Sequence, residues 1–252
     1  NKIIATDLEI PATGNTGILV MLKEEIVYEH GRETDLLFEQ AYIRLRSREG
    51  RIYSDQELQQ LPKIAATHRY ANEWEIRKRS ALKLQQYFQH KTGCGNGWLS
   101  NFLALDRQHT ITGTDINETE LEQAKRVLGN QPNLHFINGS LDHPELKGKQ
   151  YDAIVFASSI QYFESLQDVI KRSREILKPG GELHLLDSPF YDQQNVAAAR
   201  ERTIRYFNES GVPAMAAYYF HHSWEELAGL SYTILSKPDS RFRFFKKNQD
   251  PF

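Results

Sequence analysis

The sequence predicts an α/β fold with a doubly wound, mostly parallel sheet. Strand and helix patterns alternate from residue 109 onward. A glycine-rich segment, residues 93–97, precedes an apolar helical stretch, and Asp115 ends the strand that follows. Alternation of this kind is typical of parallel strands joined by crossover helices. We therefore expect a Rossmann-like sheet with a largely helical cap on its N-terminal side.

The order of elements begins with a mixed N-terminal part. We place a cap at residues 1–69 and the Rossmann-like domain, with its N-terminal helix, at residues 70–252. Within the cap, residues 18–22 predict a strand, residues 36–45 a helix or a strand, and residues 54–61 a short helix that begins at Ser54 and stops at Pro62. Residues 70–88 carry apolar side chains at helical spacing and predict a long amphipathic helix.

The later elements follow a regular alternation. Asn117, with Glu120 three residues later, predicts the start of a helix, and Pro179, Gly180 and Gly181 predict the end of another. We expect strands at residues 109–115, 134–137, 152–156, 183–186 and 232–235, and helices at 98–105, 117–128, 166–177 and 195–208.

Composition indicates a globular protein and limits its partners. Of the 252 residues, 40% are hydrophobic and 25% charged, which excludes collagen-like, coiled-coil and disordered chains. No run approaches the roughly 18 apolar residues of a membrane span. The chain has 31 Lys and Arg against 33 Asp and Glu, a formal charge of -2, so no global field attracts nucleic acid or anionic lipid. We expect neither kind of partner.

Cysteine and histidine usage bears on location and metal binding. The single Cys94 excludes an intramolecular disulfide and a multi-cysteine metal site. With no secretory signal at the start of the sequence, a reducing, cytoplasmic location is expected. His221 and His222 are adjacent, which is poor spacing for chelation because neighbouring side chains point apart. We expect no bound metal.

The glycine segment and Asp115 together indicate a ligand site. Glycines allow positive φ angles and close approach of a ligand to the backbone, and the helix start that follows offers free N–H groups. An ordinary strand-to-helix turn would also explain the glycines. Asp115 lies about 20 residues further on, at a strand end where a carboxylate accepts both hydroxyls of a ribose.

These residues resemble a known family, the class I S-adenosylmethionine-dependent methyltransferases. Residues 93–97 are similar to its first motif, Asp115 to its ribose-binding acid, and residues 177–181 to its turn before the fifth strand. Residues 70–80 and 156–163 further resemble a bacterial subgroup of unassigned substrate. The resemblance implies S-adenosylmethionine as cofactor and methyl transfer to a small-molecule acceptor. It implies cofactor binding by Trp74, Arg77, Gly93, Cys94, Gly95, Asn96, Gly97, Asp115, Ile116, Ser140, Leu141, Ala157 and Gln161.

The chain departs from the family pattern in two places that concern the sheet. No apolar strand directly precedes the glycine segment, where residues 90–92 are His, Lys and Thr. We therefore expect the central strand to be missing from the sequence near Lys91. Only one late strand is visible before Phe252, so the final hairpin of the family is also expected to be incomplete.

Catalysis by such a site depends mainly on alignment of donor and acceptor. An oxygen or protonated nitrogen acceptor must also lose a proton, and for this we select His221, His222 and Tyr162. Gln161, Tyr162, Tyr191 and the two histidines are expected to line the acceptor pocket. The alternative for the histidines is a packing role.

Two other functions remain open on the sequence. A nicotinamide-dependent oxidoreductase shares the glycine segment and Asp115, but Ser100 occupies the position of its third glycine. A non-catalytic module that binds S-adenosylmethionine would keep the same motifs. The acceptor and the oligomeric state cannot be read from the sequence.

Overall fold

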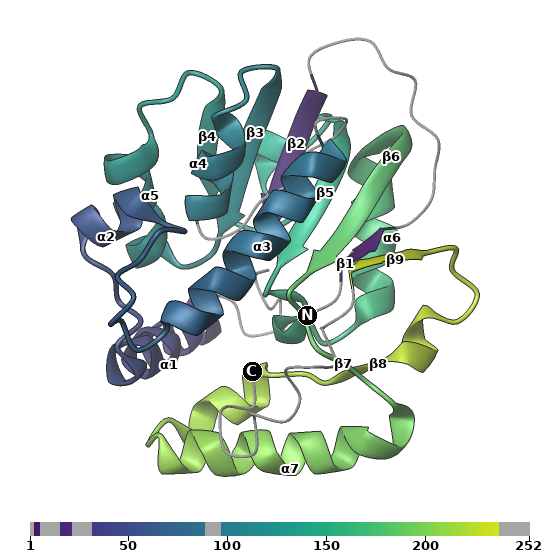
Figure 1. Cartoon of the computed structure of the whole chain (residues 1–252). Coiled ribbons are helices and arrows are strands. Elements are labelled where there is room, and N and C mark those ends of the chain that lie inside the picture. Colours follow the sequence, from purple (N-terminus) through teal and green to yellow (C-terminus); the bar gives the residue numbers. More distant parts are fainter. Residues whose placement is uncertain (1–2, 6–15, 22–31, 89–96, 237–252) are drawn as a thin grey trace.

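The computed structural model describes residues 3–5, 16–21, 32–88 and 97–236, and Figure 1 shows their arrangement. A seven-stranded sheet forms the middle layer, in the order β4-β3-β2-β5-β6-β1-β9. Five neighbouring strands run parallel: β4 (Leu134–Asn138), β3 (His109–Asp115), β2 (Thr16–Met21), β5 (Tyr151–Ala157) and β6 (Leu177–Leu186). The predicted Rossmann-like, mostly parallel sheet is confirmed.

The central strand comes from the N-terminal part of the chain. In β2, Ile18 lies opposite Ile111 of β3 and Ala153 of β5. Ile18 and Leu19 are both fully buried, and they belong to the apolar cores on opposite faces of the sheet. The expectation that the central strand is missing near Lys91 is therefore wrong. β2 fills the place next to β3 although it lies far upstream of the glycine segment.

The far edge of the sheet is antiparallel. β1 (Ile3–Ala5) pairs with β6 on one side and with β9 (Thr233–Ser236) on the other. The predicted strand at residues 232–235 is present as β9. Its partner is β1, a strand that the sequence did not reveal because it is only three residues long.

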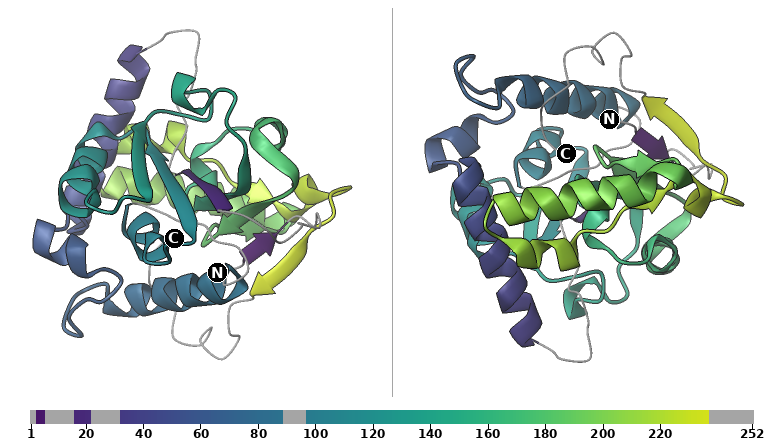
Figure 2. Two further views of the ribbon diagram at one scale, coloured as in Figure 1. Left: turned by 90° about the horizontal axis from the view of Figure 1, so that it is seen from above. Right: turned by 90° about the horizontal axis from the view of Figure 1, so that it is seen from below.

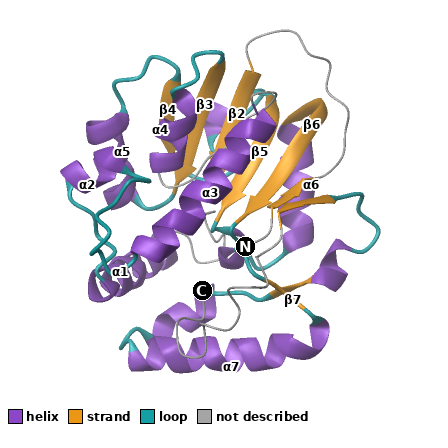
Figure 3. Cartoon of the chain, in the orientation of Figure 1, coloured by secondary structure: helices purple, strands orange, loops and turns teal. Residues whose placement is uncertain are grey.

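Helices cover both faces of the sheet (Figures 1 and 3). On one face α3 (Ala71–Phe88) and α4 (Trp98–Ala104) bury Trp74, Leu84 and Leu103 against the sheet. On the other face α6 (Leu166–Ile176) buries Leu166, Val169 and Ile170. Their spacing of three and four residues places each set on one side of its helix, which is why these helices were visible in the sequence.

Two further helices begin where the sequence predicts. α2 (Asp55–Gln60) starts at Ser54, where the Ser54 and Glu57 side chains and backbone N–H groups bond reciprocally. α5 (Glu118–Leu128) starts at Asn117, whose side chain accepts a hydrogen bond from the Glu120 N–H at 3.0 Å. Each cap satisfies N–H groups that a helix start leaves without partners.

A cap covers the sheet edge at which the parallel strands end. It combines α1 (Arg32–Glu49) with α7 (Gln193–Glu209) and the 3₁₀ segment η3 (Pro213–Tyr218). Figure 2 shows α7 lying across the molecule below the sheet, with α1 beside it. These elements share an aromatic cluster with the turn after β5, formed by Phe38, Tyr42, Tyr162, Phe207 and Tyr219.

The cap therefore differs from the one the sequence predicts. Residues 1–69 supply α1 and α2, but they also supply β1 and the central strand β2. α7 and η3, from the other end of the chain, complete the cap. A boundary at residue 69 consequently does not separate a cap from a sheet. Residues 36–45, left open as helix or strand, lie within α1.

Candidate functional site

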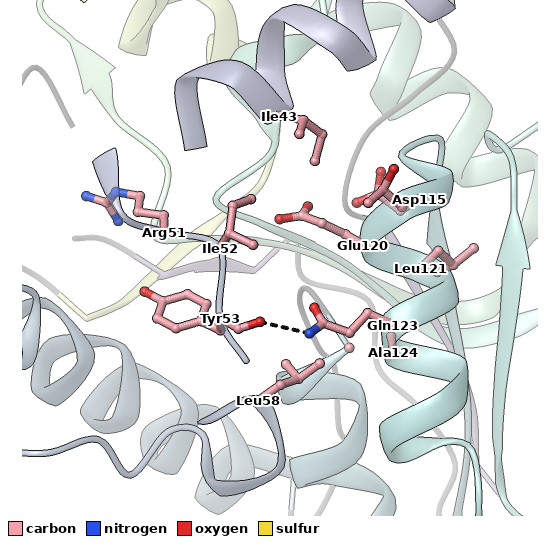
Figure 4. A pocket seen from close by; sticks show the side chains of 12 residues that line it. Ile43, Arg51, Ile52, Tyr53, Leu58, Asp115, Glu120, Leu121, Gln123 and Ala124 are labelled. Carbon is pink, nitrogen blue, oxygen red and sulfur yellow. Dashed lines mark hydrogen bonds between the residues drawn. The ribbon is translucent and has the colours of Figure 1, made fainter. Parts of the chain in front are cut away.

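An open recess lies between α5 on one side and α1, α2 and the segment joining them on the other. Its empty space is about 570 Å³, a volume that includes the open mouth. Figure 4 shows Asp115 and Glu120 on one side and Arg51 and Tyr53 on the other, with the guanidinium of Arg51 turned away from the two carboxylates. The lining residues are Ile43, Arg51, Ile52, Tyr53, Leu58, Gly97, Asp115, Thr119, Glu120, Leu121, Gln123 and Ala124.

Asp115 is the acidic group of this recess at the end of a parallel strand. It is the last residue of β3 and only 2% exposed. Its Oδ1 accepts a hydrogen bond from the Asn117 N–H at 2.7 Å, and Asn117 in turn caps α5. The carboxylate is thus oriented by the turn that follows it. Burial raises the pKa of nearby Tyr42 far above its usual value, and the negative charge of Asp115 adds to this effect.

Gly97 brings α4 into contact with α5 beside Asp115. It precedes the first residue of α4 and has φ 60°, a conformation that favours glycine. A Cβ atom at this position would lie 2.8 Å from Cβ of Ala124 and 3.4 Å from Cδ1 of Leu128. Glycine is therefore needed here both for conformation and for space. Gly93, Cys94, Gly95 and Asn96 lie outside the described residues.

A buried ion-pair network forms the wall opposite Asp115. Arg51, 6% exposed, donates to both carboxylate oxygens of Glu73 at 2.7 and 2.8 Å and lies 3.1 Å from Glu49. Its guanidinium also lies over the Tyr70 ring, 3.9 Å from the centroid. Burial raises the pKa of Glu73, but the hydrogen bonds from Arg51 and the charges of Arg77 and Arg51 outweigh burial and lower that pKa to about 2. The wall is rigid and its charges are balanced.

Trp74 and Arg77 support this wall from α3. Trp74 Nε1 donates to the Tyr53 hydroxyl at 2.8 Å, and its ring packs edge-on against Trp98. Arg77 binds Glu73 at 2.9 Å and lies over the Trp74 ring. Neither residue lines the recess, although Trp74 fixes Tyr53, which does. The cofactor contacts expected for Trp74 and Arg77 remain predictions, and the guanidinium of Arg77 already has a carboxylate partner.

The other expected cofactor residues lie at the same sheet edge but outside the recess. Ser140, 3% exposed, accepts the Asp142 N–H at 3.2 Å. Leu141 packs in the core on the α6 face, and Ile116 packs against the aromatic cluster. Ala157 ends β5. The strand order places all four, like Asp115, where β3, β4 and β5 end.

The turn after β5 contains a second polar group. Ser158 has a left-handed φ of 52°, which is rare for serine, and the 3₁₀ turn η2 (Ile160–Tyr162) follows. Gln161, 5% exposed, donates from Nε2 to the Ser158 carbonyl at 2.7 Å. Its Oε1 is buried without a hydrogen-bond partner among the described residues.

The two adjacent histidines have different surroundings. His221 Nε2 lies 2.9 Å from the Thr203 hydroxyl, and its ring lies beside those of Tyr191 and Tyr219. Burial, with smaller effects from Arg200, His222 and Arg202, lowers the pKa of His221 to about 4. The imidazole is therefore neutral at pH 7, and it is a weaker base than an ordinary histidine.

His222 is held by the protein through both ring nitrogens. Nδ1 lies 3.0 Å from Glu226 Oε2, and Nε2 lies 3.0 Å from the carbonyl oxygens of both Ile160 and Phe163. The side chain is 2% exposed. With both nitrogens engaged in the fold, this geometry corrects the expected catalytic role of His222: it holds the turn after β5. Tyr162, 9% exposed, packs against Phe38, Tyr42 and Tyr219, and its catalytic role stays a prediction.

The residues across the recess from Asp115 were not predicted from the sequence. Gln123 Nε2 donates to the Tyr53 carbonyl at 2.8 Å and to Asp55 at 3.0 Å, joining α5 to α2. No local pattern distinguishes Arg51 or Tyr53 from other residues between two helices. The capping signal at Ser54 located α2, but it did not show that α2 packs on α5.

The described part of the chain lacks two features, a cluster of metal-binding side chains and a membrane-spanning helix. Nowhere in residues 3–5, 16–21, 32–88 and 97–236 do three or more His, Cys, Asp or Glu side chains gather in a way that could hold a metal ion. Within the same ranges, no helix combines the length and apolar character needed to cross a bilayer.

Comparison with known proteins adds family information. A family model described as a methyltransferase domain matches residues 91–181. Malonyl-[acyl-carrier protein] O-methyltransferase of Halalkalibacterium halodurans is 33% identical over 95 residues, covering 36% of this chain and 35% of that protein. The ubiquinone biosynthesis O-methyltransferase of Citrobacter koseri is 27% identical over 93 residues, covering 36% of this chain and 38% of that protein.

The matches are partial in length. The malonyl-[acyl-carrier protein] O-methyltransferase of Enterobacter lignolyticus is 28% identical over 126 residues, 47% of this chain and 48% of that protein. The chain thus spans between a third and a half of these curated relatives. Among solved structures, the plantazolicin methyltransferase BpumL in complex with SAH covers 75% of this chain and 76% of its own, with TM-score 0.42 and 14% identity.

The family match covers the part of the chain that forms the sheet side of the recess. The matched range begins before the glycine segment and ends at the turn in β6, and it contains Asp115. Ser100, packed inside α4, replaces the third glycine of the nicotinamide-binding pattern. Residues 91–181 are therefore similar to a methyltransferase domain, and curated relatives that match this part of the chain are O-methyltransferases.

Proposed function

We propose that the protein binds S-adenosylmethionine and transfers its methyl group to an oxygen atom of a small-molecule acceptor. The observation that carries this proposal is the position of Asp115. Its carboxylate lies at the end of a parallel strand, beside Gly97, in an open recess. In open α/β sheets, ligands bind at this edge.

The residues present fit the proposed cofactor. Asp115 offers a carboxylate where ribose hydroxyls need an acceptor, and such charge-assisted hydrogen bonds are stronger than neutral ones. Ile43, Ile52 and Leu58 give the recess the apolar walls that small-molecule sites usually have. When bound, S-adenosylmethionine supplies an activated methyl group on a sulfonium.

The rest of the site supports positioning and proton removal. Alignment of two bound reactants accounts for much of the rate of such a displacement, and the cap of α1, α7 and η3 covers the edge where they would meet. An oxygen acceptor that carries a proton must lose it. His221, neutral and next to Tyr191, is the residue we assign to accept it. The O-methyltransferases among the relatives support an oxygen acceptor.

The proposal places this reaction in the cytoplasm and assigns no nucleic-acid partner. The formal charge of -2 and the single cysteine support these two points.

The decisive experiment is calorimetric titration with S-adenosylhomocysteine, which shares the adenosine and amino-acid parts of the cofactor. We expect the wild type to bind it. Asp115→Asn keeps an oxygen for the Asn117 N–H but removes the charge, and it should weaken binding about tenfold, because charged hydrogen bonds contribute about 1.5–3 kcal/mol.

Asp106→Asn is the matched control. Asp106 also accepts a hydrogen bond from the N–H two residues later, at 3.0 Å, but it precedes β3 at the opposite edge of the sheet. Its replacement should leave the affinity unchanged. Failure of the wild type to bind, or equal losses in both variants, would contradict the proposed function.

A further inference from the structure

Residues outside the turn after β5 hold that turn in place. The carbonyl of Gln161 accepts the Phe220 N–H at 2.7 Å, and His222 holds the carbonyls on either side, those of Ile160 and Phe163. From the sheet, the Ser159 hydroxyl donates to the Met21 carbonyl at the end of β2, at 3.2 Å. Segments 60 residues apart in the sequence thus fix one short turn, as expected of a preorganised binding element.

Within this rigid turn, the orientation of the Gln161 side chain is determined. The Ser158 carbonyl can only accept a hydrogen bond, so the group 2.7 Å from it must be the amide nitrogen. The amide oxygen therefore points the other way. It is buried, and it has no hydrogen-bond partner among the described residues.

A buried amide oxygen without a partner is costly, by about 1–3 kcal/mol. Such groups in native structures call for an explanation, such as a bound water, an ion or a functional role. Because the oxygen can only accept, the missing partner must be an N–H or O–H donor. An ionised carboxylate cannot fill this position.

The position of the turn indicates which donor is in reach. β2 lies between β3 and β5, with Met21 opposite both Thr114 and Phe156. Asp115 and Ala157, the next residues on these two strands, therefore stand about two strand spacings apart at one edge, on the order of 10 Å. In S-adenosylmethionine the ribose hydroxyls and the amino group also lie at opposite ends of an extended chain.

We propose that Oε1 of Gln161 binds the positively charged amino group of the cofactor's amino-acid end. Asp115 then binds the ribose and Gln161 the amino group, on either side of β2. This inference rests on the proposed function, and it adds a specific contact that fixes the end of the cofactor nearest the turn after β5.

The test compares three probes that share the adenosine part and differ at the amino-acid end. S-adenosylhomocysteine carries both the amino group and the carboxylate, decarboxylated S-adenosylmethionine keeps the amino group alone, and 5′-methylthioadenosine lacks both. The second probe also carries a methylsulfonium in place of a thioether, so each affinity is compared between wild type and variant for the same probe. Gln161→Leu removes the amide with little change in volume. We expect it to weaken the first two probes about tenfold, and to leave the affinity for 5′-methylthioadenosine within about twofold.

Gln167→Leu is the matched control, because its Nε2 also donates to a backbone carbonyl, that of Glu226, but on α6 away from the site. It should change none of the three affinities. Equal weakening of all probes by Gln161→Leu would overturn the inference by showing a purely structural role. Unchanged affinity for S-adenosylhomocysteine would also overturn the inference. It would indicate that the amide oxygen binds the methyl acceptor instead.

These outcomes are distinct from failure of the proposed function. If the wild type binds none of the three probes, the proposed function fails and this inference falls with it. If the wild type binds S-adenosylhomocysteine and only the Gln161 comparison fails, the proposed function stands.

Discussion

Adjacent residues can have unrelated roles when successive side chains point apart, and His221 and His222 illustrate this. His221 faces Thr203 and Tyr191, whereas His222 turns to the carbonyls of the turn after β5. The sequence showed a pair of histidines in an aromatic segment. It could not show which of them is held by the fold, because those partners lie about 20 and 60 residues away in the chain.

The lowered pKa of His221 follows mainly from its burial, and it gives a prediction for this single residue. Its pKa is about 4 in the folded protein against 6.5 for an unperturbed histidine. Between these two values the unfolded chain binds more protons, so protonation favours unfolding. The contribution of His221 is therefore fully present above pH 6.5 and is lost as the pH falls toward 4. NMR titration of the ring protons should give a midpoint near 4.

A stability comparison checks the same prediction independently. His221→Gln removes the titrating group. The free energy of unfolding of the variant, measured with urea, should therefore rise relative to that of the wild type as the pH falls from 6.5 to 4. Above pH 6.5 the difference between the two should stay constant. A ring midpoint near 6.5 would contradict the assignment and would place His221 in contact with solvent.

Among secondary-structure elements, those with a clear pattern were predicted well. β3, α5, α6 and α7 appear within about three residues of their expected bounds, because capping residues and apolar periodicity are local signals. The place of β2 was not predictable in this way. Its pattern indicated a strand, but its neighbours β3 and β5 lie 90 to 140 residues away.

The short turn η2 depends on β8 (His222–Ser223) more than on its own sequence. His222→Leu places an apolar side chain of similar size at this position and removes the hydrogen bonds to the carbonyls of Ile160 and Phe163, of which, among the described residues, only that of Ile160 keeps another donor, the Phe163 N–H at 3.1 Å. We expect a loss of about 2–4 kcal/mol in the free energy of unfolding, measured with urea. The substitution removes hydrogen bonds that no other described side chain makes to these two carbonyls.

His135→Leu serves as the comparison for that loss. His135 is an exposed residue of β4, and surface substitutions of this kind change stability by less than about 0.5 kcal/mol. Similar losses in both variants would show that η2 is held by its own sequence rather than by β8.

At the level of the whole molecule, both ends of the chain contribute to the site. α1 comes from the N-terminal part and packs with α7 and η3 from the C-terminal part in one aromatic cluster. Asp115 was predicted as a binding residue from motif spacing, and it is one of the residues that line the recess. Arg51 and Tyr53 were missed because only the tertiary fold brings them opposite Asp115. Motifs thus revealed the sheet side of the site but not the side formed by the cap.

The central position of β2 leads to the last prediction. A chain beginning at residue 70, the boundary that the sequence suggests, lacks β2 and leaves one edge of both β3 and β5 without a partner. It also loses Ile18, Leu19 and Met21, all fully buried, and each large apolar side chain lost from a core costs about 2–5 kcal/mol. These losses together match or exceed the 5–15 kcal/mol by which a domain is stable. The shortened chain should therefore show no cooperative urea transition and no dispersed amide spectrum. A chain beginning at residue 16 keeps β2 and loses β1, which joins the edge strand β9 to β6. It should still unfold cooperatively, at a lower urea concentration than the full chain. A cooperative transition in the chain from residue 70 would mean that another segment can take the central place, and that β2 does not define the sheet.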